Sequence, residues 1–296
     1  MLPVILSLMF LALAQGMPIT VPANHPAGGK PLRARGKAKT PGNSEKKLEK
    51  RRTEFQSDYS MAQQVEYSGE FESALTRFLE LEQQTPGLDG DYRDAGLQAV
   101  LRHEAQCLMR LKRFPEAEKI YLKRGEVLKG MKYSVPTDYA HNLAFLSFSR
   151  FAKQDFAGAD MYLQQGMVEY DKVIQEYVDL KSSPAVLAGP RRLKAIDMGY
   201  LGIVYSKEGK SGEALRTLEN SYATSTELHA EPAERARVAA AGRDTAFGSF
   251  HWIDAIVWEL RLSGVNKELK QEKAKAARNA PAPHPEDTAP ATPAKD

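Results

Sequence analysis

The sequence contains a single cysteine, Cys107, among 296 residues. An intramolecular disulfide is therefore excluded, and so is any metal site built from several thiolates. We interpret Cys107 as a small buried hydrophobic residue of a helix. The alternative, in an exported chain, is a reactive or intermolecular thiol.

The motifs of well-known catalytic sites are also lacking. The histidines form neither an HExxH pair nor a Cys/His cluster, and there is no Gly-x-Ser-x-Gly turn. Gly209-Lys210-Ser211 resembles the end of a phosphate-binding loop, but Val204 stands where that loop requires a glycine. We therefore predict no enzyme activity, no catalytic or metal-ligating residue and no cofactor. The alternative is an enzyme whose site is assembled only in space.

The central part of the chain has no surplus of basic residues. The formal net charge is +3, of which residues 24–52 carry +8 and residues 265–296 carry +1, so residues 53–264 carry −6. A nucleic-acid-binding domain would be expected to present a basic face. We therefore predict that the folded body does not bind nucleic acid.

No charged side chain occurs before Lys30. Residues 2–14 form a short apolar run that ends in the A-x-A sequence Ala12-Leu13-Ala14, which is typical of a secretory signal peptide. We predict a signal peptide at residues 1–16 and export to the periplasm or the exterior. The alternative is an uncleaved N-terminal segment that anchors the protein to the membrane.

The sequence also lacks runs that alternate between apolar and polar residues, as strands do. Helical periodicity extends over residues 53–264, which we predict to be the folded domain. Residues 17–52 are predicted to be a basic flexible linker. Residues 265–296 are predicted to be a helical extension followed by a disordered tail rich in proline and alanine.

A spaced pattern of small residues recurs within the helical region. Ala74 lies three residues after Phe71 and four before Phe78, so all three share one helix face. The same spacing surrounds Ala117, Ala159 and Ala214. A second small residue lies twelve positions before each of these alanines, at Ala62, Ala105, Ser147 and Gly202. We predict pairs of helices that cross closely at these positions.

With these residues in place, the chain resembles the tetratricopeptide repeat (TPR) family. Leu201, Gly202 and Tyr205 match the L-G-x-x-Y part of its first helix, and Gly209 and Ala214 match its turn and second helix. The repeat spacing of 42–43 residues is similar to the longer repeats of kinesin light chains. The resemblance implies an all-α, right-handed solenoid of antiparallel helix pairs. We expect the amphipathic segment 247–262, with Phe250, Ile253 and Leu260 on one stripe, to cap its core.

The resemblance also implies a function in binding. First helices of such repeats line a concave groove that receives a peptide or a helix. By register, the partner-binding positions here are Tyr59, Gln63, Tyr67, Arg102, Gln106, Arg110, Phe148, Phe151 and Lys207. For Phe148 and Phe151, packing against the neighbouring repeat is an equal alternative.

The sequence therefore predicts an exported scaffold for protein–protein interaction, with an unknown protein or peptide as its partner. The alternative is an architectural repeat protein that associates with itself.

Overall fold

The computed structural model describes residues 43–131 and 136–279. The predicted signal peptide, most of the basic linker and the tail at 280–296 lie outside the described residues.

The described residues form helices and no strand, so the all-α prediction is confirmed. A short 3₁₀ turn, Thr85–Gly87, separates the first two helix pairs. The α-helices are α2 (Asn43–Tyr67), α3 (Phe71–Gln84), α4 (Gly90–Arg110), α5 (Phe114–Gly130), α6 (Pro136–Ala152), α7 (Phe156–Asp179), α8 (Pro184–Lys207), α9 (Ser211–Glu227), α10 (Pro232–Gly248) and α11 (Trp252–Asn279).

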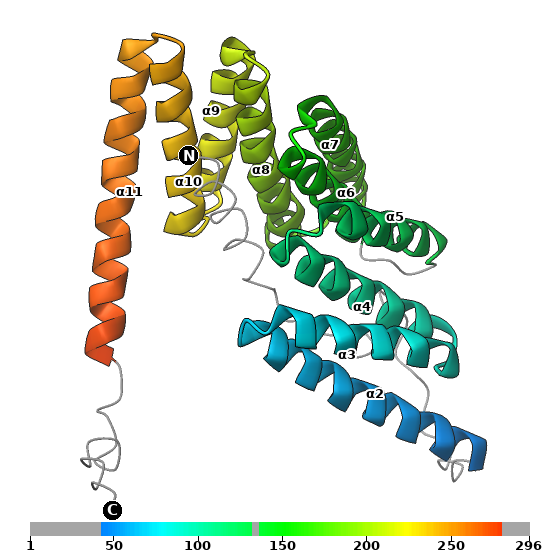
Figure 1. Ribbon diagram of the computed structural model, residues 1–296. Coiled ribbons are helices and arrows are strands. Elements are labelled where there is room, and N and C mark those ends of the chain that lie inside the picture. The colour runs from blue at the N-terminus through cyan, green and yellow to red at the C-terminus, as the bar shows by residue number, and fades with distance from the viewer. Residues whose placement is uncertain (1–42, 132–135, 280–296) are drawn as a thin grey trace, which may run out of the picture.

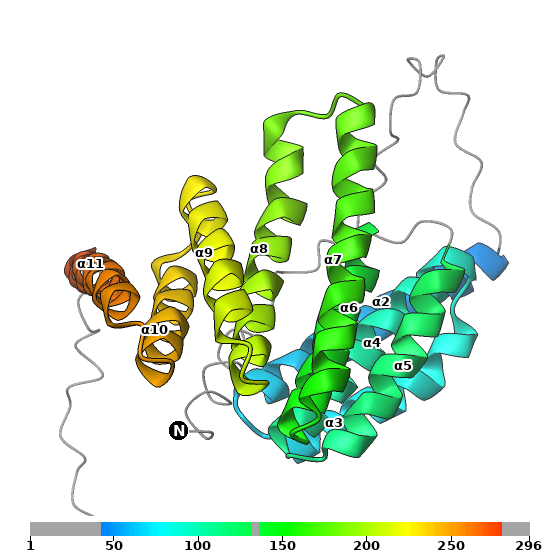
Figure 2. The same cartoon turned by 90° about the horizontal axis from the view of Figure 1, so that it is seen from above.

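Consecutive helices pack side by side and build an α-solenoid. Within the described residues there are five pairs, α2/α3, α4/α5, α6/α7, α8/α9 and α10/α11, and each second helix also contacts the first helix of the next pair. The pairs follow one another along a curved array, with α2 and α3 at one end and α11 at the other (Figures 1 and 2). This arrangement is the predicted solenoid.

The repeated small residues lie where the helices cross, as predicted. Ala74, Ala117, Ala159 and Ala214 are completely buried. A Cβ atom on Gly202 would lie 2.6 Å from the Leu218 Cγ atom, which is closer than real Cβ contacts come. The small residues therefore let paired helices approach, because a larger side chain has no space there.

A fifth repeat unit is present that the sequence pattern did not reveal. Each turn within a pair contains one residue with positive φ, and the fifth of these is Phe250, with φ of 61°. Ala255 follows it by five residues and is completely buried, as Ala74 follows Gly69. Arg243 occupies the position twelve residues before Ala255, where the other units have a small residue. Because Arg243 breaks the pattern of small residues, the sequence did not reveal the fifth helix pair as a repeat unit.

Helix α2 begins inside the segment that we expected to be a flexible linker. Residues 43–52 are helical because Glu45 lies in the first turn, where a negative charge is favourable, and because Lys and Arg are good helix formers. Arg51 also donates a hydrogen bond to the Gly87 carbonyl oxygen at 3.2 Å. The charge pattern of this segment therefore reflects a solvated helix face.

The apolar stripe of segment 247–262 does not cap the core in the way we expected. Helix α11 buries Ala255, Trp258 and Val265 against the array. Ile253 and Leu260 lie on the opposite side and are exposed. Trp258 faces inward because Gly242 of α10 leaves room for its ring.

None of the helices in the described ranges combines the length and the apolar character that a membrane-spanning segment requires.

Candidate functional site

First helices of successive pairs lie closer together than second helices do. Helix α2 contacts α4, α6 contacts α8, and α8 contacts α10, whereas no contact of this extent joins second helices of neighbouring pairs within the described ranges. Elements on the inner side of a curved array are closer to one another than those on the outer side. We call the surface formed by α2, α4, α6, α8 and α10 the first-helix face.

The predicted partner-binding residues fall into three groups by exposure. Tyr67 and Lys207 are exposed. Gln63, Arg102, Gln106 and Arg110 are half-buried, and Tyr59, Phe148 and Phe151 are buried. The structure therefore leaves the polar members of the set within reach of a partner and places three of the aromatic rings in the core.

Phe148 and Phe151 are packing residues. The Phe148 ring meets the Tyr200 ring edge-on, with 4.5 Å between centroids, which links α6 to α8. The Phe151 ring meets Phe156 in the same manner at 5.3 Å. The Phe148 contact is the packing against a neighbouring repeat that the sequence left open, whereas Phe151 packs within its own helix pair.

The two arginines among the predicted partner-binding residues, Arg102 and Arg110 of α4, have different surroundings. The Arg110 guanidinium lies over the Phe71 ring, 5.7 Å from its centroid, and burial lowers its pKa. Arg102 has a nitrogen 3.3 Å from the His103 ring and interacts electrostatically with Tyr59, Tyr121 and Arg124. The basic centre of the face is therefore Arg102 with Arg124.

Arg124 is a buried cation on α5, only 1% exposed. Its guanidinium donates hydrogen bonds to the Gln98 backbone oxygen at 3.1 Å, the Gln98 side-chain oxygen at 3.0 Å and the Asn142 Oδ1 atom at 3.0 Å. All three acceptors are neutral. Burial, followed by the nearby positive charge of Arg102, lowers the pKa of Arg124 to about 10. Sequence reasoning missed this residue, because it belongs to a second helix and the expected binding positions lie on first helices.

His103 is a buried residue of α4 that lies next to Arg102. Its Nδ1 atom donates to the Glu66 Oε2 atom at 2.6 Å, and its ring stacks on Phe78. Its Nε2 atom lies 3.2 Å from the Gln63 Nε2 atom and 3.3 Å from an Arg102 nitrogen. Both neighbours are donors, so Nε2 must accept and the imidazole is neutral. Burial lowers the pKa of His103, which agrees with this tautomer.

Polar atoms without partners gather around the same basic centre. The hydroxyl groups of Tyr59 and Tyr121 and the Nε atom of Arg102 are buried and accept or donate no hydrogen bond within the described part of the chain. Buried polar groups are normally bonded, so unbonded ones call for an explanation. Tyr59 and Tyr121 both interact electrostatically with Arg102, so the three unbonded atoms belong to one neighbourhood.

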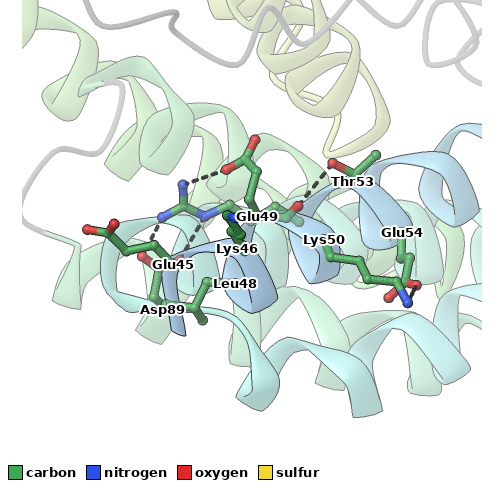
Figure 3. A pocket seen from close by; sticks show the side chains of 9 residues that line it. Glu45, Lys46, Leu48, Glu49, Lys50, Thr53, Glu54 and Asp89 are labelled. Carbon is green, nitrogen blue, oxygen red and sulfur yellow. Dashed lines mark hydrogen bonds and ion pairs between the residues drawn. The ribbon is translucent and has the colours of Figure 1, made fainter. Parts of the chain in front are cut away.

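A separate hollow lies at the start of α2 and is lined mainly by charged side chains, among them Glu49, Arg52 and Asp89 (Figure 3). Arg52 donates two hydrogen bonds to the Asp89 carboxylate and lies 5.3 Å from the centroid of the Tyr92 ring. Lys50 also forms an ion pair with Glu54. The Arg52–Asp89 pair holds α2 against the turn before α4, so we assign the hollow to helix packing.

Cys107 is completely buried, and burial raises its pKa. This agrees with the interpretation of the residue as a small hydrophobic side chain.

No family profile and no curated protein matches the chain. Solved structures do match. Two crystal structures of a Podosopora anserina protein, described as a kinesin light chain with nearly identical TPR-like repeats, share 12% identity with this chain. Each match covers 74% of this chain. The first covers 98% of its own chain with a TM-score of 0.56, and the second covers 97% of its own chain with a TM-score of 0.54.

BtubC (BKLC) from P. vanneervenii shares 15% identity, with 84% of this chain and 99% of its own covered and a TM-score of 0.55. At these identities the likeness concerns the fold. The chain therefore has a TPR-like repeat fold, as the sequence resemblance predicted.

Proposed function

We propose that the protein is an exported scaffold whose first-helix face binds an acidic, extended or helical segment of a partner protein. The TPR-like fold supports a scaffold function in protein–protein interaction. The positive charge around Arg102 supports the proposal that the bound segment is acidic.

The observation that carries the proposal is the pair of arginines without an acidic partner. Among the described residues, neither Arg102 nor Arg124 forms an ion pair with a carboxylate, and Arg102 is only half-buried. Most other partly exposed arginines, such as Arg52 and Arg192, have such a partner. A positive charge in a partly desolvated position is stabilised by an incoming anion.

The side chains around this centre have separable roles. Arg102 would contact a carboxylate of the bound segment directly. Arg124, which is buried, would add positive potential without touching the segment. Gln63 and Gln106 are half-buried amides on α2 and α4 that can bond to the backbone of a bound segment. Tyr67, 61% exposed, offers an aromatic surface at the end of α2.

The surrounding body carries a net negative charge. Attraction of an acidic segment would therefore be local, acting over about one Debye length of 8 Å at physiological salt. We expect binding to weaken as salt is raised.

The export part of the proposal rests on the N-terminal sequence, where an apolar run ends in Ala12-Leu13-Ala14. Protein isolated from its native host and found by mass spectrometry to begin at Met1 would contradict cleavage and support an N-terminal anchor.

Replacing Arg102 with alanine is expected to weaken binding of acidic peptides by about 10-fold or more, since hydrogen bonds to charged groups contribute about 1.5–3 kcal/mol. The measurement is fluorescence anisotropy with acidic, neutral and basic peptides of equal length. The control is Arg216→Ala, which removes an exposed arginine from the second helix α9. Equal acidic-peptide affinity in both variants would show that Arg102 is not the binding centre.

A further inference from the structure

Helix α11 presents an apolar surface that no described element covers. Large side chains at seven positions between residues 247 and 260 are exposed, and we call them the terminal apolar face. They are Phe247, Phe250, Trp252, Ile253, Ile256, Val257 and Leu260. The Trp252 ring meets both Phe247 and Phe250 edge-on, at 5.6 and 6.3 Å between centroids.

The architecture of the array indicates that this face is incomplete. Every earlier second helix is covered by the first helix of the next pair: α3 by α4, α5 by α6, α7 by α8, and α9 by α10. Helix α11 is also a second helix, and it lies at the outer end of the array in both views (Figures 1 and 2). An apolar patch of this extent marks an interaction site.

The sequence that follows α11 offers few side chains suited to this face. Residues 280–296 contain no leucine, isoleucine, valine, methionine or aromatic residue, so they offer little apolar area. The apolar run at residues 2–14 would be removed under the proposed export.

We propose that the terminal apolar face binds a second copy of this chain, with the two α11 helices packed antiparallel about a two-fold axis near Ile256 and Leu260. The sequence of α11 is complementary to itself in this orientation. Its stripe is bulky at Ile253 and Ile256 and small further on, at Ser263 and Gly264. An antiparallel pair therefore places the bulky half of one helix over the small half of the other, and a parallel pair does not.

The charged residues of α11 also favour antiparallel packing. The exposed residue Asp254 lies near the start of α11, and Lys267 and Lys270 lie in its second half. Antiparallel packing brings the acidic end of each helix toward the basic part of the other, and it also aligns the two helix dipoles favourably. A parallel pair would bring like charges together.

The first test is the mass of the processed chain, which begins after the proposed signal peptide at residues 1–16, by sedimentation equilibrium over a range of concentrations. We expect a reversible dimer of twice the mass of that chain. The double variant Ile253→Glu, Leu260→Glu should raise the dimer dissociation constant by at least about 10-fold. Both residues are exposed, so the variant should keep its helical circular dichroism. The matched control is Val168→Glu, an exposed valine on α7, which should dimerise as the unaltered chain does.

The second test determines the orientation by disulfide cross-linking. Chains with Ile253→Cys should form few dimers alone and should cross-link to chains with Gly264→Cys when the two are mixed. Chains with Leu260→Cys should cross-link to one another. Cross-linking of Ile253→Cys chains among themselves would overturn the antiparallel arrangement. A monomer at all concentrations would overturn the proposal and leave the face to another protein or to the N-terminal apolar segment.

Discussion

Replacing Gly202 with leucine is expected to destabilise the protein by about 3 kcal/mol and to lower its melting temperature by roughly 6–12 °C. A Cβ atom at this position would lie 2.6 Å from Leu218 Cγ and 3.3 Å from the Ala214 carbonyl oxygen. Leu218 is itself completely buried and cannot move aside freely. The helices α8 and α9 would have to separate at the point where they cross.

The matched control is Gly212→Leu, the same substitution on α9. A Cβ atom on Gly212 would meet nothing within 4 Å, so this variant should be as stable as the unaltered protein or slightly more stable, because leucine favours helices over glycine. Thermal unfolding followed by circular dichroism compares the two. Similar melting temperatures would contradict the assigned crossing position.

Replacing Glu104 with glutamine is expected to stabilise the protein above pH 8, by up to about 4 kcal/mol. The Glu104 side chain is completely buried on α4. Burial, followed by the neighbouring negative charge of Glu82, raises its pKa to about 8, and Lys123 opposes this rise only in part. The carboxyl group is therefore neutral in the folded protein at low and neutral pH, as a glutamine amide is.

The sign of the pH dependence follows from the raised pKa. The group ordinarily titrates near pH 4.5, so below that pH it is protonated in both the folded and the unfolded chain. As the pH rises toward about 8, the unfolded chain loses the proton readily while the folded protein retains it, and the stability that this group contributes is lost. The glutamine variant has no titrating carboxyl group at position 104, so its stability does not fall for this reason as the pH rises.

Urea unfolding at several pH values measures the effect as the difference between the variant and the unaltered protein. The control is Glu80→Gln, an exposed glutamate on α3, which should show no such difference. A difference between the Glu104 variant and the unaltered protein that does not grow between pH 5 and pH 8 would contradict the raised pKa of this carboxyl group.

Much of the fold was predictable because it rests on short-range spacing. The alanines at positions 74, 117, 159 and 214 recur at fixed distances from bulky residues, and that pattern requires helix pairs in register. The fifth pair was not predictable in this way, because Arg243 replaces the small residue and Gly242 beside it receives Trp258 instead. Here a local change in packing removed the sequence signal while the backbone pattern stayed the same.

The candidate site was only partly predictable. The register placed Arg102, Gln63 and Gln106 on first helices, which is where the structure has them. The register could not show that the Phe148 ring packs on Tyr200, because the exposure of Phe148 depends on how the next helix pair, α8 and α9, lies against α6. Nor could it associate Arg102 with Arg124, because that proximity arises from the packing of α4 on α5.

The exposure of the α11 stripe was equally hidden from the sequence. Apolar residues lie on both sides of this helix, with Trp258 on one and Ile253 on the other. Periodicity alone does not determine which side meets the core.

The most direct test of the proposed function places a photo-reactive amino acid on the first-helix face in the native host. At position 106, where Gln106 lies one turn after Arg102, irradiation should produce a covalent adduct with a partner protein, and an excess of acidic peptide should suppress it. At position 122, where Leu122 is exposed on the second helix α5, the same residue should produce no such adduct. An adduct from position 122 and none from position 106 would contradict binding through the first-helix face.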